Sequence, residues 1–184
     1  MRFAALEQVA IPCVLAEIVP GKLHPDGRRY LPLIVLQLPE PPASDAPHVR
    51  RLGVVDRHHV VDPALVGRSG TARLVFLLSL LRLQPPPYRQ GIFDEQEPAA
   101  GRASTAVTAC GVATHVPAWE AQRAHLPYEA LYTELVLDVG CGTIGVRTST
   151  TAESLAEAIG KPQIEPGDWL CVRRSRIDIL AFEV

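Results

Sequence analysis

Residues 134–184 read ELVLDVGCGTIGVRTSTTAESLAEAIGKPQIEPGDWLCVRRSRIDILAFEV. Two β-rich runs, 134–140 and 143–150, flank the glycines of a turn, which predicts a pair of short strands. Residues 151–160 predict a helix that Thr150 or Thr151 caps and Gly160 ends. The turn Pro166-Gly167-Asp168 then leads into one long predicted strand, 170–184. The expected order is therefore strand, turn, strand, helix, turn and long strand.

The composition supports a β-rich globular protein. Of the 184 residues, 47% are hydrophobic, which is enough to build a packed core. The 17 prolines and 13 glycines favour many short strands over long helices. Eighteen basic and twenty acidic residues give a net charge of −2, so no global charge draws the chain to nucleic acid.

The first half of the chain repeats this order more faintly. Strands are expected at 9–19, 30–38 and 50–61. The apolar run within 71–84 fits a buried helix or a long strand, and we favour a strand because Gly70 precedes it and Pro85-Pro86-Pro87 follows it. In the second half, 103–117 is β-rich and 118–132 predicts a helix. The similar order of elements suggests an internal duplication.

The stretch 134–178 resembles the OB-fold, the oligonucleotide- and oligosaccharide-binding barrel. The resemblance rests on the glycine turn in LDVGCGTIGV, the helix AESLAEAIG, the PGD turn and the final SRID. It implies a mainly β chain with two small OB-like β-barrels in tandem, each with one short helix. We expect the N-terminal barrel at 1–92, a linker at 93–102 and the C-terminal barrel at 103–184.

The motif VLDVGCGTIG also resembles the first glycine-rich motif of methyltransferases that bind S-adenosylmethionine. Asp138, Gly140 and Gly142 match that motif, but Ile144 replaces its next glycine. A β-rich segment follows where the cofactor requires a helix N-terminus. A β-turn between paired strands explains these glycines more simply, so a methyltransferase remains a remote alternative.

Arginines suggest a binding face. Residues 22–89 contain ten basic and five acidic residues, a local excess of positive charge. In OB-folds the second and third strands form the usual binding face. We therefore predict non-catalytic binding of single-stranded nucleic acid, through phosphate contacts, by Arg50, Arg51, Arg57, His59, Arg73, Arg173, Arg174 and Arg176. With only 5% aromatic residues, base stacking is limited, so a protein-interaction or assembly module is the alternative.

No catalytic residue, cofactor or metal site is expected. Asp56, His58, His59 and Asp62 form a polar cluster, but adjacent histidines on a strand point to opposite faces, which favours exposed side chains over metal ligands. The four cysteines are scattered and predicted to be small core residues. Charged residues interrupt the N-terminal apolar run, and no run is long enough to span a bilayer, so a reducing cytoplasm is the expected location.

Overall fold

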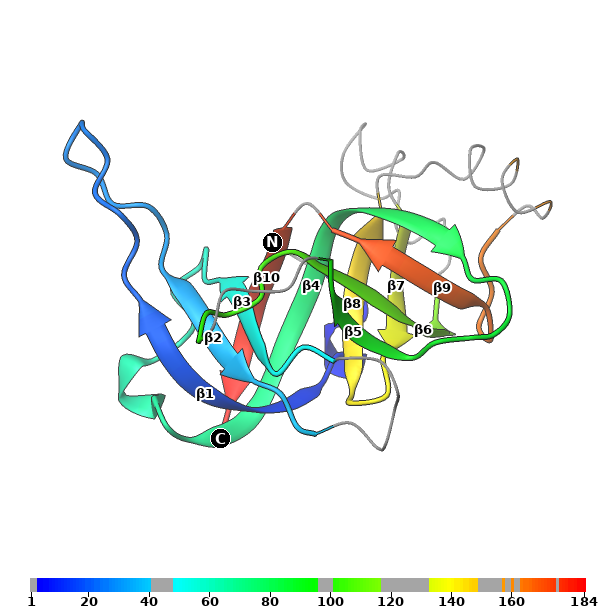
Figure 1. Cartoon of the computed structure of the whole chain (residues 1–184), viewed down its shortest axis with the longest axis horizontal. Helices are drawn as coiled ribbons and strands as arrows, with labels where there is room; N and C mark the ends of the chain where they lie inside the picture. The colour runs from blue at the N-terminus through cyan, green and yellow to red at the C-terminus, as the bar shows by residue number, and fades with distance from the viewer. Residues whose placement is uncertain are drawn as a thin grey trace.

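The computed structural model describes residues 3–40, 48–95, 101–116, 133–148, 157, 160, 163–174 and 176–184. Strands dominate these residues, which confirms a mainly β protein (Figure 1). The elements are η1 (Leu6–Gln8), β1 (Ile11–Val19), β2 (Leu33–Gln37), β3 (Arg51–Val55), η2 (Pro63–Leu65), β4 (Ser69–Leu83), β5 (Gly91–Asp94), β6 (Val107–His115), β7 (Thr133–Asp138), β8 (Thr143–Thr148), β9 (Trp169–Arg173) and β10 (Arg176–Glu183).

Five strands close a barrel. β1 pairs antiparallel with β2, and β2 pairs antiparallel with β3. β10 lies between β3 and β4, parallel to β3 and antiparallel to β4. β4 pairs with β1 and so completes the circle. This closed five-stranded barrel is compatible with the OB-like barrel that the sequence resembles.

The other strands build on the same long strand, β4. Its C-terminal part pairs antiparallel with β9, and β8 pairs parallel to it. β8 pairs with β7, β7 with β6, and β6 with both β5 and β9. β4 therefore belongs to two sets of strands, and β10, from the C-terminal end of the chain, completes the barrel of β1 to β4. The domain division at 93–102 stays a prediction, although strand pairing crosses it.

β4 confirms the strand interpretation of the long apolar run. Ala72, Leu74 and Phe76 pack into the main hydrophobic core, whereas Val75 and Leu77 pack into a smaller cluster on the opposite face. Both faces of the strand are buried, so its sequence lacks the usual alternation of polar and apolar residues. That is why periodicity alone could not separate it from a helix.

Two predicted strands differ most from expectation. The third strand ends at Val55, because the buried carboxylate of Asp56 accepts hydrogen bonds from the backbone N–H groups of Val60 (2.9 Å) and Val61 (3.0 Å) and closes a turn. The single strand expected at 170–184 is two strands, β9 and β10. β9 pairs with β6 and the end of β4, while β10 pairs with β3 and the start of β4.

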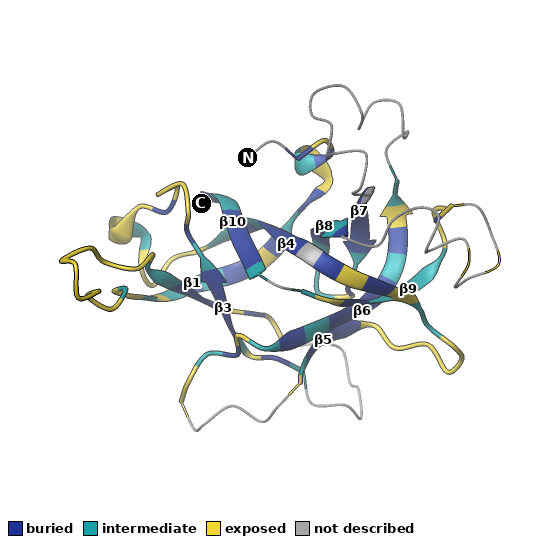
Figure 2. Cartoon of the chain, turned by 90° about the horizontal axis from the view of Figure 1, so that it is seen from above, coloured by how far each residue is buried: buried dark blue, intermediate teal, exposed yellow. Residues whose placement is uncertain are grey.

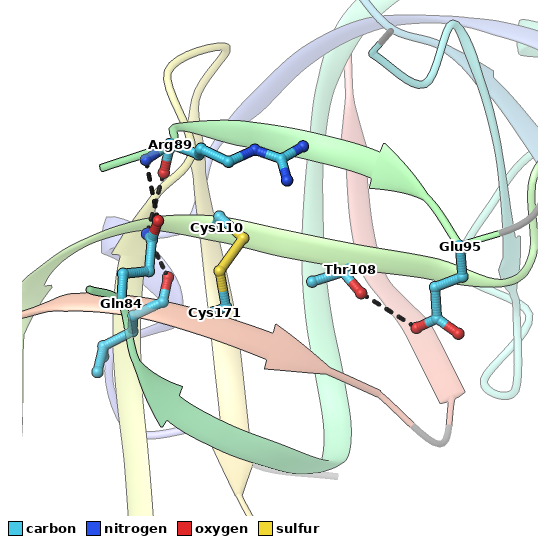
Figure 3. The surroundings of a disulfide bond; sticks show 7 residues. Gln84, Arg89, Glu95, Thr108, Cys110 and Cys171 are labelled. Atoms are coloured by element: carbon cyan, nitrogen blue, oxygen red, sulfur yellow. Dashed lines mark hydrogen bonds between the residues drawn. A yellow bond between two sulfur atoms is a disulfide. The ribbon is translucent and has the colours of Figure 1, made fainter. Parts of the chain in front are cut away.

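The prediction of small buried core residues is confirmed for Cys13 and Cys110, whereas Cys141 and Cys171 are half-buried, and the sequence did not predict a disulfide. Cys110 on β6 and Cys171 on β9 form a disulfide between directly opposed positions, while Cys13 and Cys141 are free (Figure 3). Both predicted helices lie outside the described residues: all of 118–132, and 151–160 except Glu157 and Gly160.

Candidate nucleic-acid interface

Two loops leave the closed barrel at the same end. Val19, at the end of β1, is the register partner of Leu33, at the start of β2, and Leu33 is the partner of Val55, at the end of β3. Residues 20–32, here called the finger, and residues 56–68 therefore emerge side by side. Together they are called the rim. The finger projects from the molecule beyond β1 and β2, and both rim segments are largely exposed (Figures 1 and 2).

The finger has a defined backbone. Tyr30 N–H donates to the carbonyl of Lys22 (2.9 Å), and His24 N–H donates to the carbonyl of Arg28 (2.7 Å). The tip is a turn in which Gly27, at φ +83°, donates to the carbonyl of His24 (2.9 Å). These bonds hold the two arms of the finger antiparallel, which sets where along the finger each side chain starts.

The side chains of the finger are basic and partly apolar. Lys22, Arg28 and Arg29 have no carboxylate partner among the described residues. Tyr30 is 60% exposed, and Leu23 is 63% exposed. The rings of Tyr30 and His24 form a T-shaped contact, with 5.7 Å between centroids and 81° between planes. Cations interleaved with an exposed aromatic ring are the combination that single-stranded nucleic acid requires.

The second rim segment adds two exposed arginines, Arg57 and Arg68. Neither pairs with a carboxylate in the described part of the chain. His59 is exposed and adopts φ 52°, a left-handed backbone conformation that the turn imposes. The two segments together contain five Lys or Arg residues and three Asp residues. The carboxylate of Asp56 is bound to the backbone of its own turn.

Of the predicted site residues, only Arg57 and His59 lie on the rim. Arg50 and Arg51 lie at the opposite end of β3, where Arg50 pairs with Glu40 and Arg51 pairs with Glu17 at 2.9 Å. Hydrogen bonding to Arg50 lowers the pKa of Glu40. The positive charge of both arginines is therefore largely compensated.

The C-terminal arginines occupy a third region, at the junction of β9 and β10. Arg173 pairs with Glu95 at 3.2 Å, and its hydrogen bonds lower the pKa of that carboxyl. Arg176 donates from Nε and Nη2 to Asp178 at 2.6 and 3.1 Å. Arg174 lies between the two strands and is half-buried. These residues do not join Arg57 and His59 in one site.

Arg73 has a structural position. Its Nη1 donates to the carbonyl oxygens of Leu6 (2.8 Å) and Val9 (3.2 Å), and its Nε and Nη2 both donate to Glu183 at 3.1 Å. The hydrogen bonds to Glu183 raise the pKa of Arg73. One guanidinium thus joins the N-terminal segment, β4 and the C-terminal strand.

Sequence reasoning missed Lys22, Arg28, Arg29 and Tyr30. The available signal was the Pro25-Asp26-Gly27 turn, which predicted a hairpin between the first two strands. That hairpin places its arms outside the barrel, so any charged residue on them is exposed. The count of positive charge over 22–89 included these residues but did not separate them from the paired arginines of β3.

The glycine motif at 138–143 lies between two antiparallel strands, β7 and β8. Gly140, at φ +80°, donates its N–H to the carboxylate of Asp138 (2.8 Å). At Gly142, at φ +147°, a Cβ would lie 2.4 Å from the carbonyl oxygen of Ala10. The glycines therefore serve a hairpin that packs closely on the segment leading into β1, which is the β-turn interpretation of this motif.

Within the described residues, no three His, Cys, Asp or Glu side chains gather into a group that could hold a metal ion. No helix of the described chain is long and apolar enough to cross a membrane. Comparison with protein-family models, with curated proteins and with solved structures found no match for this chain.

Proposed function

We propose that this protein binds single-stranded nucleic acid at the rim of its closed barrel, without catalysing a reaction. The observation that carries the proposal is the finger: three cations without carboxylate partners among the described residues, next to an exposed tyrosine. Lys22, Arg28 and Arg29 bind phosphates, and the ring of Tyr30 stacks on a base. Arg57 and Arg68 extend the phosphate-binding surface along the neighbouring segment.

The charge distribution supports this location over the predicted one. Arg50, Arg51, Arg173 and Arg176 each have a carboxylate within hydrogen-bonding reach. Each of these carboxylates offsets the charge of its arginine and repels an approaching phosphate, which weakens the attraction at these positions. The rim cations have no carboxylate partner among the described residues, which favours the rim for phosphate binding.

The strand pairings support a second, finer proposal about the fold. In one set, β1, β2 and β3 form a meander, β3 pairs in parallel with β10, and β4 joins β10 to β1. In the other set, β6, β7 and β8 form a meander, β8 pairs in parallel with β4, and β9 joins β4 to β6. We propose two duplicated OB-like barrels in which each half of the chain supplies one strand to the other barrel.

Charge reversal at the finger tests the function. We expect Arg28→Glu/Arg29→Glu to weaken the binding of a fluorescein-labelled oligonucleotide at low salt by at least tenfold, measured by anisotropy. The matched control is Arg102→Glu, at an exposed arginine away from the rim, compared with the single variant Arg28→Glu, which makes the same change of charge. Equal loss of affinity in both variants would mean that only net charge matters, and that the finger is no specific site.

A protein partner is the second candidate, because the finger and its base also expose Val19, Leu23 and Leu31. Contiguous exposed apolar side chains are a feature of protein interfaces. Under this candidate, wild-type protein would fail to bind oligonucleotides and would form a stable oligomer at low micromolar concentration. Leu23→Ser would dissociate that oligomer in analytical ultracentrifugation.

A further inference from the structure

The loop between β4 and β5, residues 84–90, is held in one conformation by a single side chain. Oε1 of Gln84 accepts a hydrogen bond from the backbone N–H of Arg89 (2.9 Å), and Nε2 of Gln84 donates to the carbonyl of Arg89 (3.0 Å). The same Nε2 donates to the carbonyl of Leu170 on β9 (2.9 Å). Figure 3 shows this clamp next to the Cys110–Cys171 disulfide. The loop is therefore fixed at both ends and to a neighbouring strand.

The clamped loop presents an aromatic ring to solvent. Tyr88 stacks on Trp169 of β9 with 4.9 Å between ring centroids and 6° between ring planes. Tyr88 is nevertheless 51% exposed, because Trp169 covers only one of its faces. A ring supported from behind loses little freedom when a ligand stacks on its outer face, which favours binding.

The residue after Tyr88, Arg89, stacks its guanidinium on a different ring. The guanidinium of the exposed Arg89 lies 4.2 Å from the ring centroid of Phe93, and His48 contacts the same ring at 4.8 Å. A guanidinium stacked on a ring keeps its N–H donors at its edge for an anion. No carboxylate pairs with Arg89 among the residues that the structure describes.

Two arginine charges act on His48. Burial lowers the pKa of His48, and the charges of Arg89 and Arg50 lower it further. Arg50 pairs with Glu40, so Arg89 is the cation of this group that remains available to a ligand. Gly91 makes the packing possible: a Cβ there would lie 2.3 Å from Cε1 of His48.

We infer that Tyr88 and Arg89 form a second contact for single-stranded nucleic acid, in which a base stacks on the outer face of Tyr88 and Arg89 binds an adjacent phosphate. This inference rests on the proposed function and adds a site on the loop between β4 and β5, packed against Trp169 of β9 and away from the rim. Supported aromatic rings beside unpaired arginines are how single strands are held without sequence preference.

Fluorescence of Trp169 tests the contact directly, because this residue is the partner of Tyr88. The chain has two tryptophans, so Trp119→Phe leaves Trp169 as the only one. We expect the emission of Trp169 in this variant to change on addition of an oligonucleotide of thymidines, about 30 nucleotides long, since one barrel covers about 4–16 nucleotides. Tyr88→Phe should preserve the response, while Tyr88→Ala and Arg89→Met should each weaken the affinity for the labelled oligonucleotide about tenfold.

Three results would overturn the inference. In the first, wild type binds in the anisotropy assay, but the emission of Trp169 does not change and Tyr88→Ala and Arg89→Met bind with wild-type affinity. The contact then does not exist, and the function proposed for the rim is unaffected. If wild type binds no oligonucleotide at low salt, the function and the contact fall together. If a neutral oligosaccharide changes the emission of Trp169 and the oligonucleotide does not, the aromatic pair is a carbohydrate site.

Discussion

At the scale of single residues, the structure separates arginines that hold the fold from arginines that face a ligand. Arg73 belongs to the first group, since its three N–H-bearing nitrogens serve two backbone carbonyls and Glu183. We predict that Arg73→Met lowers the free energy of unfolding by about 2 kcal/mol, because two half-buried acceptors lose a charged donor. Urea denaturation measures this change. Arg57→Met, in an exposed turn, should stay within about 0.5 kcal/mol of wild type, and equal effects would contradict the distinction.

A histidine gives a prediction about pH. The pKa of His48 is lowered from its ordinary value of 6.5 by burial and by Arg89 and Arg50. The unfolded chain therefore takes up a proton at His48 more readily than the folded protein. Protonation of His48 therefore costs no stability above pH 6.5. The free energy of unfolding falls as the pH drops through 6.5 toward the lower pKa of His48 in the folded protein. Between pH 8 and pH 5, the free energy of unfolding from urea denaturation should fall less for His48→Gln than for wild type. An identical fall in both proteins would show that His48 does not contribute to the pH dependence.

At the scale of elements, the disulfide joins β6 to β9 across 61 residues of chain. A cross-link of that span restricts the unfolded chain, so Cys110→Ala/Cys171→Ala should lower the free energy of unfolding by about 2–4 kcal/mol. Cys141→Ala removes a free, half-buried thiol and serves as the control. The denatured, unreduced protein should react with maleimide at Cys13 and Cys141 alone, and four reactive thiols would contradict the bond.

The disulfide also bears on location. Disulfides persist in oxidising compartments and are rare in a reducing cytoplasm. The cytoplasmic location expected from the sequence remains a prediction, and the same maleimide assay on freshly lysed cells, with thiols blocked at lysis, tests it. Four reactive thiols in the cell would be consistent with a reducing compartment.

Most strands could be predicted from composition and turns, because β-rich apolar runs alternate with turns such as Pro20-Gly21 and Pro85-Pro86-Pro87. The break between β9 and β10 could not, because β-rich residues lie on both sides of the polar run 173–176 and no glycine or proline marks the change of partner strand. The disulfide was missed for a related reason: Cys110 and Cys171 are far apart in sequence and meet only through the pairing of β6 with β9.

The candidate site could be predicted only in part, since charge counting cannot tell a paired arginine from a free one. Arg51 and Arg57 are six residues apart on what looked like one strand face. The structure pairs Arg51 with Glu17 and leaves Arg57 on the exposed rim, because Asp56 ends the strand between them. Pairing depends on which strands become neighbours, and that is a property of the whole fold.

At the scale of the whole molecule, β4 and β10 connect the two sets of strands, and the main core runs through both. We therefore predict one cooperative unfolding transition for the full chain, with circular dichroism and Trp fluorescence giving the same midpoint. A chain truncated after Arg174 lacks β10, which leaves β3 and β4 without a shared neighbour, and should not fold. Two separate transitions in the full chain would contradict the exchange of strands and favour independent barrels.

We propose that cations on the rim without carboxylate partners among the described residues bind the phosphates of a single strand. The most direct measurement is the affinity of the wild-type protein for a labelled oligonucleotide over a series of salt concentrations. Three to five phosphate contacts predict that the logarithm of the association constant falls against the logarithm of salt concentration with a slope of about −2 to −3.5. Absence of binding at low salt, or an affinity that salt does not change, would contradict the claim.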